Sequence, residues 1–195
     1  FVGMIDREIT RVASIVQNMY QLYRKEPSKA EPVDLALLLR DLESVFAKRL
    51  SQLGLTLVVT QAPLRSKLLV PQSDLLQVLM NLVQNALDSS RGGGTITLNV
   101  RQDADIVRIS VSDEGSGIPP GVLPHIFDPF FTTKTEKGQK GMGLGLSVSQ
   151  SLVMAMGGRM EVQTEQGAGS TFWIILPEPA TGSQTSGLQN IIEEV

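Results

Sequence analysis

The segment "MNLVQNALDSS" (80–90) carries two asparagines, Asn81 and Asn85, in an otherwise apolar stretch. Drawn as a helix from about Ser73 to Ser90, its apolar residues gather on one broad side, with a narrow polar stripe beside them. A carboxamide offers one hard oxygen and two N–H donors without net charge, which suits a magnesium ion already surrounded by phosphate oxygens. The segment predicts a helix that is buried on one side and carries an asparagine pair whose chemistry would suit a metal and phosphate site. The alternative, a solvated stripe, suffices for Asp74 and Gln77.

Composition narrows the class of protein. The 195 residues are 42% hydrophobic and 19% charged, as in soluble globular proteins. A formal net charge of −3 favours neither nucleic acid nor an anionic membrane surface as a partner. There are no cysteines, which excludes disulfides and is compatible with a reducing compartment. No apolar run reaches the roughly 18–20 residues that span a bilayer. Because Phe1 already lies inside a helical pattern, we expect a piece of a longer protein.

The chain divides into four parts. Residues 1–26 follow an a/d heptad pattern, which predicts a bundle-forming helix. Such a helix could pack on its own domain, but the charged, proline-containing linker 27–32 favours self-association into a homodimer. Residues 33–177 form the predicted main domain. Residues 178–195 read as a linker followed by a short helix.

The main domain mixes helix and strand signals without a regular alternation. We expect an α/β (α+β) two-layer sandwich, with a mixed, largely antiparallel sheet covered by helices on one face and preceded by the bundle-forming helix. The predicted helices are 34–53, 73–90 and 146–156. The predicted strands are 55–61, a possible short strand at 66–70, a hairpin over 95–113, and a final hairpin over 159–177 that turns at 167–169.

An acidic residue ends the strand "DIVRISVSD" (105–113). Period-two alternation places Asp113 on the same inward side as Val107, Ile109 and Val111. An inward carboxylate is costly unless it meets donors, and an adenine amino group would supply one. Gly115 and Gly117 would let the backbone approach a flat base. The alternative is an ordinary turn in which Asp113 bonds its own loop.

A glycine-rich loop, "KGQKGMGLGLSVSQ" (137–150), leads directly into a helix. The exposed N–H groups at the start of that helix form an anion site, and Lys134, Lys137 and Lys140 lie nearby in the sequence. The spacing matches neither the phosphate loop of P-loop enzymes nor the dinucleotide-binding pattern. By itself it is a generic flexible loop.

Taken in order, these motifs resemble the sequence boxes of sensor histidine kinases. The asparagine pair is followed by "DEGSG" (113–117), "IFDPFFTTK" (126–134), "GMGLGL" (141–146) and "GAGSTFWIILP" (167–177). The resemblance covers about residues 32–177 and implies the ATP-binding domain that these kinases share with gyrase, mismatch-repair ATPases and heat-shock chaperones. Residues 1–26 look like the second helix of the dimerisation hairpin.

The resemblance implies ATP and Mg²⁺ as cofactors and assigns roles. Asn85 would coordinate Mg²⁺, Asn81 would line the phosphate pocket, and Asp113 would bind the adenine amino group with support from Thr171. A mobile lid at about 130–140, anchored by Phe130 and Phe131, would cover the triphosphate. The remaining residues would shape the base pocket, contact phosphate or wrap the triphosphate. They are Gly115, Gly117, Ile118, Lys134, Lys140, Gly141, Met142, Gly143, Leu144, Gly145 and Leu146.

Position 81 separates kinases from ATPases of the superfamily, and position 88 departs from the pattern of many relatives. Superfamily ATPases place a water-activating Glu where this chain has Asn81, and an amide cannot act as a general base. Asp88 stands where many relatives place a phosphate-binding Lys or Arg, so it is not counted as a site residue. The family's phosphoacceptor histidine is absent. The single histidine, His125, matches no acceptor motif and is interpreted as a surface or lid-hinge residue.

The leading hypothesis is a histidine kinase fragment that binds ATP but does not phosphorylate itself. The full-length protein would pass the phosphoryl group to a histidine and then to an aspartate of a response regulator. We expect a cytoplasmic protein, or the cytoplasmic part of a membrane-bound sensor, without nucleic-acid or membrane contact by this fragment. A related serine kinase, an ATPase and a non-catalytic nucleotide-dependent scaffold remain as alternatives.

Overall fold

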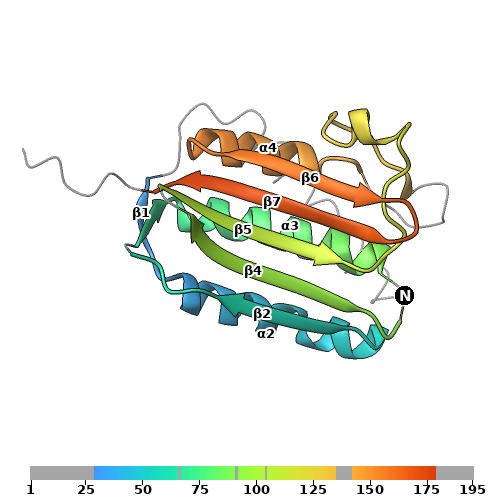
Figure 1. The fold of residues 1–195 in the computed structure, drawn as a ribbon, viewed down its shortest axis with the longest axis horizontal. Helices are drawn as coiled ribbons and strands as arrows, with labels where there is room; N and C mark the ends of the chain where they lie inside the picture. Colours follow the sequence, from blue (N-terminus) through green and yellow to red (C-terminus); the bar gives the residue numbers. More distant parts are fainter. Residues whose placement is uncertain (1–28, 66, 91, 104, 135–141, 179–195) are drawn as a thin grey trace, which may run out of the picture.

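A computed structural model describes residues 29–65, 67–90, 92–103, 105–134 and 142–178 (Figure 1). One layer is a five-stranded sheet in the order β2-β4-β5-β7-β6, and helices cover one of its faces. The strands are β1 Glu31–Val33, β2 Thr56–Gln61, β3 Leu68–Val70, β4 Thr95–Asp103, β5 Ile106–Asp113, β6 Arg159–Glu165 and β7 Gly169–Pro177. The helices are α2 Leu35–Leu53, α3 Gln72–Ser89 and α4 Gly145–Ala155, with a 3-10 turn, η1, at Leu123–His125. This architecture confirms the predicted sandwich.

The sheet is mixed and largely antiparallel, as predicted. β2 runs parallel to β4, whereas β4–β5, β5–β7 and β6–β7 are antiparallel. Within β5 the burial alternates without interruption, so Val107, Ile109, Val111 and Asp113 face the helices. The predicted inward direction of Asp113 is therefore confirmed.

Local signals explain where α2 begins and ends. The carboxylate of Asp34 accepts a hydrogen bond from the Leu37 N–H at 3.1 Å, which satisfies a donor that the first turn leaves without an intrahelical partner. At the other end Gly54 takes a left-handed conformation with φ of 63°, the usual helix stop. Both ends lie where the sequence predicts them.

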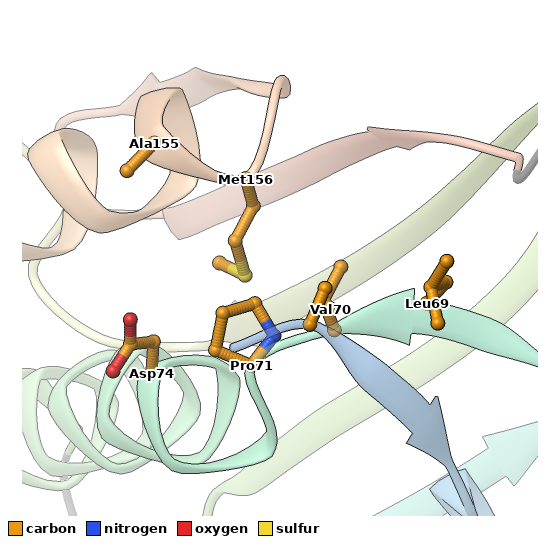
Figure 2. A pocket seen from close by; sticks show the side chains of 7 residues that line it. Leu69, Val70, Pro71, Asp74, Ala155 and Met156 are labelled. Atoms are coloured by element: carbon orange, nitrogen blue, oxygen red, sulfur yellow. The ribbon is translucent and has the colours of Figure 1, made fainter. Parts of the chain in front are cut away.

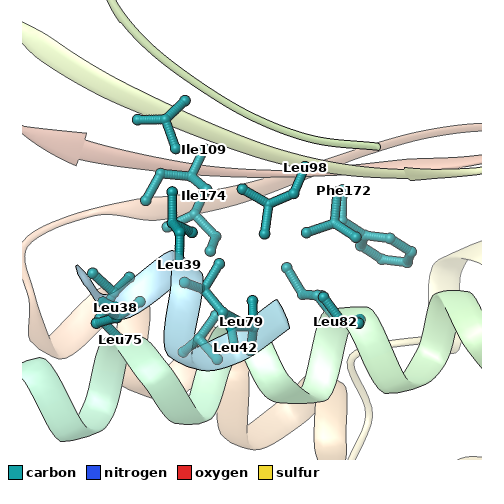
Figure 3. Close-up of a cluster of buried hydrophobic side chains, with 14 of the residues drawn as sticks. Leu38, Leu39, Leu42, Leu75, Leu79, Leu82, Leu98, Ile109, Phe172 and Ile174 are labelled. Atoms are coloured by element: carbon teal, nitrogen blue, oxygen red, sulfur yellow. The ribbon is translucent and has the colours of Figure 1, made fainter. Parts of the chain in front are cut away.

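The core lies between α2, α3 and the sheet (Figure 3). Leu75, Leu79 and Leu82 of α3 point toward Leu98, Ile109 and Ile174 of the sheet, and all six are at most 1% exposed. Truncating such a leucine to alanine typically costs about 2–5 kcal/mol. The apolar side of α3 is therefore held firmly, which fixes the direction of its polar stripe.

The sequence interpretation of residues 27–32 as linker is partly wrong. Glu31 and Pro32 belong to β1, which pairs antiparallel with β3 in a separate two-stranded sheet. Among the described residues β1 pairs only with β3, and proline is tolerated in such an edge position. The bundle-forming helix predicted for residues 1–26 lies outside the described residues, as does the tail beyond residue 178. Within the described part of the chain, no helix is both long and apolar enough to cross a membrane.

Candidate nucleotide-binding site

Asn81 joins α3 to the beginning of α4. Its side-chain nitrogen donates to the Gly145 carbonyl and to the Ser149 hydroxyl, both at 3.2 Å. Its oxygen accepts from the Gln77 amide at 3.3 Å. Gln77 is therefore engaged with Asn81 rather than merely solvated. The amide at position 81 fixes where the α4 N-terminus lies relative to the polar stripe of α3.

The side chain of Lys134 contacts α3 about one turn beyond Asn81. The ammonium of Lys134 donates to the Asn85 side-chain oxygen at 2.9 Å and to the Asp88 carboxylate at 2.8 Å. Arg49 of α2 approaches the other Asp88 oxygen at 3.4 Å, and Gln84 donates to that same oxygen at 2.7 Å. Asp88, which the family pattern does not mark as a site residue, is the anion around which these donors gather.

Asp113 ends β5 as a buried carboxylate, 9% exposed. It accepts a hydrogen bond from the Gly115 N–H at 2.9 Å. Burial raises the pKa of this carboxyl above its ordinary 3.8, and hydrogen bonds from Gly115, the Ser89 side chain and the Ser170 backbone oppose that rise. No positively charged group is among these causes. Ser89, at the end of α3, is a contributor that the sequence analysis did not name.

The turn after Asp113 requires glycine at two positions. A Cβ on Gly115 would lie 2.5 Å from the Ser89 carbonyl oxygen, so the turn approaches the end of α3 too closely for a side chain. Gly117 has φ of 61°, and a Cβ there would meet the Glu165 carbonyl oxygen at 2.0 Å. The half-buried Ile118 follows, and its N–H donates to the Thr164 hydroxyl at 2.9 Å. These contacts fix the loop beside Asp113.

The start of α4 offers backbone N–H groups. Leu144 stands at the N-cap position, and no side chain caps the helix. The first N–H groups of a helix have no intrahelical partners, and with the helix dipole they favour anions. Met142, Gly143, Gly145 and Leu146 are half-buried around this end. Leu144 is 2% exposed and its side chain belongs to the core. Lys140 and Gly141 lie outside the described residues.

The role predicted for Thr171 is wrong. Thr171 pairs with Ser112 in the sheet and donates to its hydroxyl at 2.9 Å, on the face away from Asp113. Ser170 is the residue paired with Asp113, and it is 8% exposed. Counting in steps of two back from Phe172, which faces the core, would have identified Ser170 from the sequence.

The two phenylalanines before Lys134 differ. Phe130 is 65% exposed with φ of 68°, so it does not anchor the loop by apolar burial as expected. Its N–H donates to the Gly143 carbonyl at 2.9 Å, which ties this segment to the turn before α4. The ring of Phe131 lies 5.7 Å from that of His125. His125 pairs with Asp128 at 2.9 Å and its side chain is 55% exposed, consistent with the surface position expected for it.

A cavity of about 230 Å³ lies at the opposite end of α3 (Figure 2). Its lining includes Pro71 and Asp74 at the beginning of α3 and Ala155 and Met156 at the end of α4. Asp74 is 5% exposed, so it does not belong to a solvated stripe as the sequence suggested. None of the predicted site residues lines this cavity. The predicted residues gather instead where α3 and β5 end and α4 begins (Figure 1).

Comparisons with known proteins show the family to which the chain belongs. Residues 71–180, more than half of the chain, match the family model described as histidine kinase-, DNA gyrase B- and HSP90-like ATPase. The aerobic respiration control sensor protein ArcB of Escherichia coli K12 is 36% identical over 166 residues, which is 83% of this chain and 21% of ArcB. The sensor histidine kinase ZraS of Escherichia coli K12 is 31% identical over 181 residues, covering 93% of this chain and 38% of ZraS.

A solved structure has a similar fold. The crystal structure of full-length ShkA in complex with AMPPNP superposes with a TM-score of 0.77 at 29% identity, covering 88% of this chain and 36% of ShkA. This chain thus spans about a fifth to two fifths of the length of these relatives. The chain belongs to the histidine kinase-, DNA gyrase B- and HSP90-like ATPase family, as a catalytic ATP-binding domain of the sensor histidine kinase type.

Proposed function

We propose that this chain is the ATP-binding part of a longer protein that transfers the γ-phosphoryl group of ATP to a histidine, and from there to an aspartate of a response regulator. One observation carries the proposal. A buried carboxylate, Asp113, lies at the same end of the fold as the Asn85–Lys134 pair and the uncapped start of α4. An adenine beside Asp113 would meet a hydrogen-bond acceptor. Phosphates beside Lys134 and the start of α4 would meet cationic or N–H donors.

The residues present fit a magnesium nucleotide. The Asp113 carboxylate would accept a hydrogen bond from the adenine amino group. Lys134 and the first N–H groups of α4 would bind phosphate oxygens. The Asn85 side-chain oxygen is a hard ligand suited to Mg²⁺. When bound, Mg²⁺ would neutralise charge on the phosphates and so lower the barrier to phosphoryl transfer.

The amide at position 81 favours transfer to a protein over hydrolysis. A water-activating glutamate would have to point a carboxylate at a water near the phosphates. Asn81 instead donates to the Gly145 carbonyl and the Ser149 hydroxyl, so its amide is engaged in joining two helices. A domain of this kind would keep its nucleotide until a nucleophile from another part of the protein approaches in line.

The partners follow from the same proposal. The nucleophile would be a histidine outside this chain, since His125 lies in an exposed turn and matches no acceptor motif. Residues 1–26 would form the second helix of a dimerisation hairpin and hold two copies together, while residues 33–177 bind the nucleotide. A response-regulator receiver domain would then accept the phosphoryl group on an aspartate.

Calorimetric titration with the nonhydrolysable analogue AMP-PNP tests the proposal. We expect binding on the order of micromolar to millimolar in the presence of Mg²⁺, and no steady phosphate release when ATP is supplied. The longer protein should become labelled from ATP radioactive at the γ position, in an acid-labile form typical of phosphohistidine. Lack of nucleotide binding would refute the proposal, and steady phosphate release would support the ATPase alternative.

A further inference from the structure

The ammonium of Lys134 lies between two side chains that are three residues apart on α3. It is 2.9 Å from the Asn85 oxygen and 2.8 Å from an Asp88 oxygen. Residues three apart on a helix share a face, so a single cation reaches both. The side chains of Lys134 and Asp88 are 29% and 18% exposed, so the pair is shielded from water more than an ordinary surface ion pair.

Asp88 is held from three elements. Lys134 arrives from the segment before α4, Arg49 from α2, and Gln84 from the preceding turn of α3. A carboxylate with several donors has a fixed orientation, and it fixes its donors in turn. Asp88 therefore anchors Lys134 against α3. Lys134 would otherwise be a long side chain with considerable rotamer freedom.

This anchoring affects the atom to which the proposed function assigns the metal. Mg²⁺ binds ligand oxygens at about 2.1 Å, so an ammonium and Mg²⁺ on the same amide oxygen would be close together. Two cations at such separation repel each other strongly in a partly buried site. Lys134 and Mg²⁺ therefore compete for the Asn85 oxygen, and Asp88 favours Lys134 in that competition.

We propose that Asp88 is a positioning residue that sets how much Mg²⁺ the site needs. By holding Lys134 on the Asn85 oxygen, it requires the metal to displace the ammonium, which then becomes available to a phosphate. This inference rests on the proposed nucleotide site and adds to it the control of metal dependence. It also assigns a role to the position at which many relatives carry a basic residue.

The test compares Asp88→Asn with the unchanged chain. The amide keeps the shape of the carboxylate but removes its charge, so Lys134 should be held less firmly. We expect the free Mg²⁺ concentration that gives half-maximal AMP-PNP affinity to fall about fivefold. Asp103→Asn is the matched control, because Asp103 also pairs with two basic side chains, Arg101 and Arg108, and lies at the opposite end of the sheet.

A second variant separates anchoring from a general change of charge. If Asp88 acts through Lys134, Asp88→Asn should leave the Mg²⁺ requirement unchanged in a Lys134→Gln background. A through-space effect of the lost charge would persist there. Amide hydrogen exchange of residues 130–134 in the nucleotide-free chain should also become faster in Asp88→Asn, because the anchor is weakened.

The outcomes distinguish the two proposals. If the chain binds AMP-PNP but Asp88→Asn leaves both the Mg²⁺ requirement and the exchange rates unchanged, the role of Asp88 is refuted and the nucleotide site stands. A shift of equal size in the Lys134→Gln background refutes it as well. Failure of the unchanged chain to bind AMP-PNP refutes the proposed function and this inference together. Thermal unfolding of each variant verifies that it is folded.

Discussion

At the base end of the proposed site, Asp113 is oriented mainly by the backbone and short neighbours: the Gly115 N–H, the Ser170 backbone and the Ser89 side chain. At the phosphate end, Asn85 and Asp88 are instead connected through the long side chain of Lys134. The contacts of Asp113 are fixed mainly by the backbone, whereas the contacts of Lys134 are made by a side chain that can change partners. A fixed acceptor suits a flat, uncharged base, whereas phosphates and a metal need donors that can change partners.

The largest effect is expected from a substitution that disturbs the backbone conformation at the base end. Gly117→Ala should lower the free energy of unfolding by roughly 2–4 kcal/mol, because φ of 61° disfavours alanine and its Cβ would overlap the Glu165 carbonyl oxygen. AMP-PNP affinity should fall with it. Urea unfolding measures the first effect and calorimetry the second. Gly121→Ala is the control, since nothing lies within 4 Å of its Cβ position. Equal stability of the two variants would contradict the expectation.

The charge at the base end can be removed without disturbing the backbone. Asp113→Asn should weaken AMP-PNP binding about 30-fold, the usual value of a hydrogen bond to a charged group. The folded state should nevertheless be as stable as the unchanged chain at neutral pH, because burial penalises the ionised carboxylate. Calorimetry and urea unfolding measure the two effects. Ser112→Ala is the control, because Ser112 faces the other side of the sheet.

The difference between the two ends also explains what the sequence could and could not predict. Asp113 was predictable because its direction depends on the period of its own strand, which the sequence shows directly. The same period, applied to β7, separates Ser170 from Thr171, and the incorrect role for Thr171 came from matching a motif without counting the alternation. Local periodicity therefore predicts which residues of β5 and β7 face the base end, but not the contact that Ser89 of α3 makes with Asp113.

The phosphate end was harder to predict because its contacts join residues far apart in the chain. Nothing local to Asp88 shows that Lys134 and Arg49 reach it across 46 and 39 positions. The strand formed by Glu31 and Pro32 depends likewise on pairing with β3, so its sequence alone resembles a linker. Phe130 is exposed and has a left-handed backbone conformation, which sequence patterns rarely indicate for an aromatic residue.

A metal-dependent effect is expected at the phosphate end. Asn85→Ala should lower AMP-PNP affinity on the order of tenfold in Mg²⁺, and much less in EDTA, because the lost oxygen is the proposed metal ligand. Titrations under both conditions measure the difference. Asn99→Ala is the matched control, since Asn99 donates to Thr60 on β2, away from the site. An equal loss with and without Mg²⁺ would contradict the assignment of Asn85 to the metal.

The smallest effect, and the one that separates the two ends most cleanly, is a pH dependence that belongs to Asp113. Its pKa is raised by burial, so the folded chain holds a proton there more readily than the unfolded chain does. The corresponding stability is complete below the unfolded value and is lost as pH rises through the folded one. Nucleotide affinity should change in the opposite direction, because only the ionised carboxylate is a full acceptor for the adenine amino group.

Urea unfolding and AMP-PNP titration from about pH 4 to pH 7 should therefore give Asp113 contributions of opposite slope, each taken as the difference between the unchanged chain and Asp113→Asn. The amide does not titrate, so contributions from other carboxyl groups and from protonation of the base itself remain in the variant and cancel in the difference. Asn85→Ala, which alters only the phosphate end, should keep both slopes while its affinity is lower throughout. Differences whose slopes have the same sign, or an affinity difference that does not change with pH, would mean that the base is not recognised by this carboxylate.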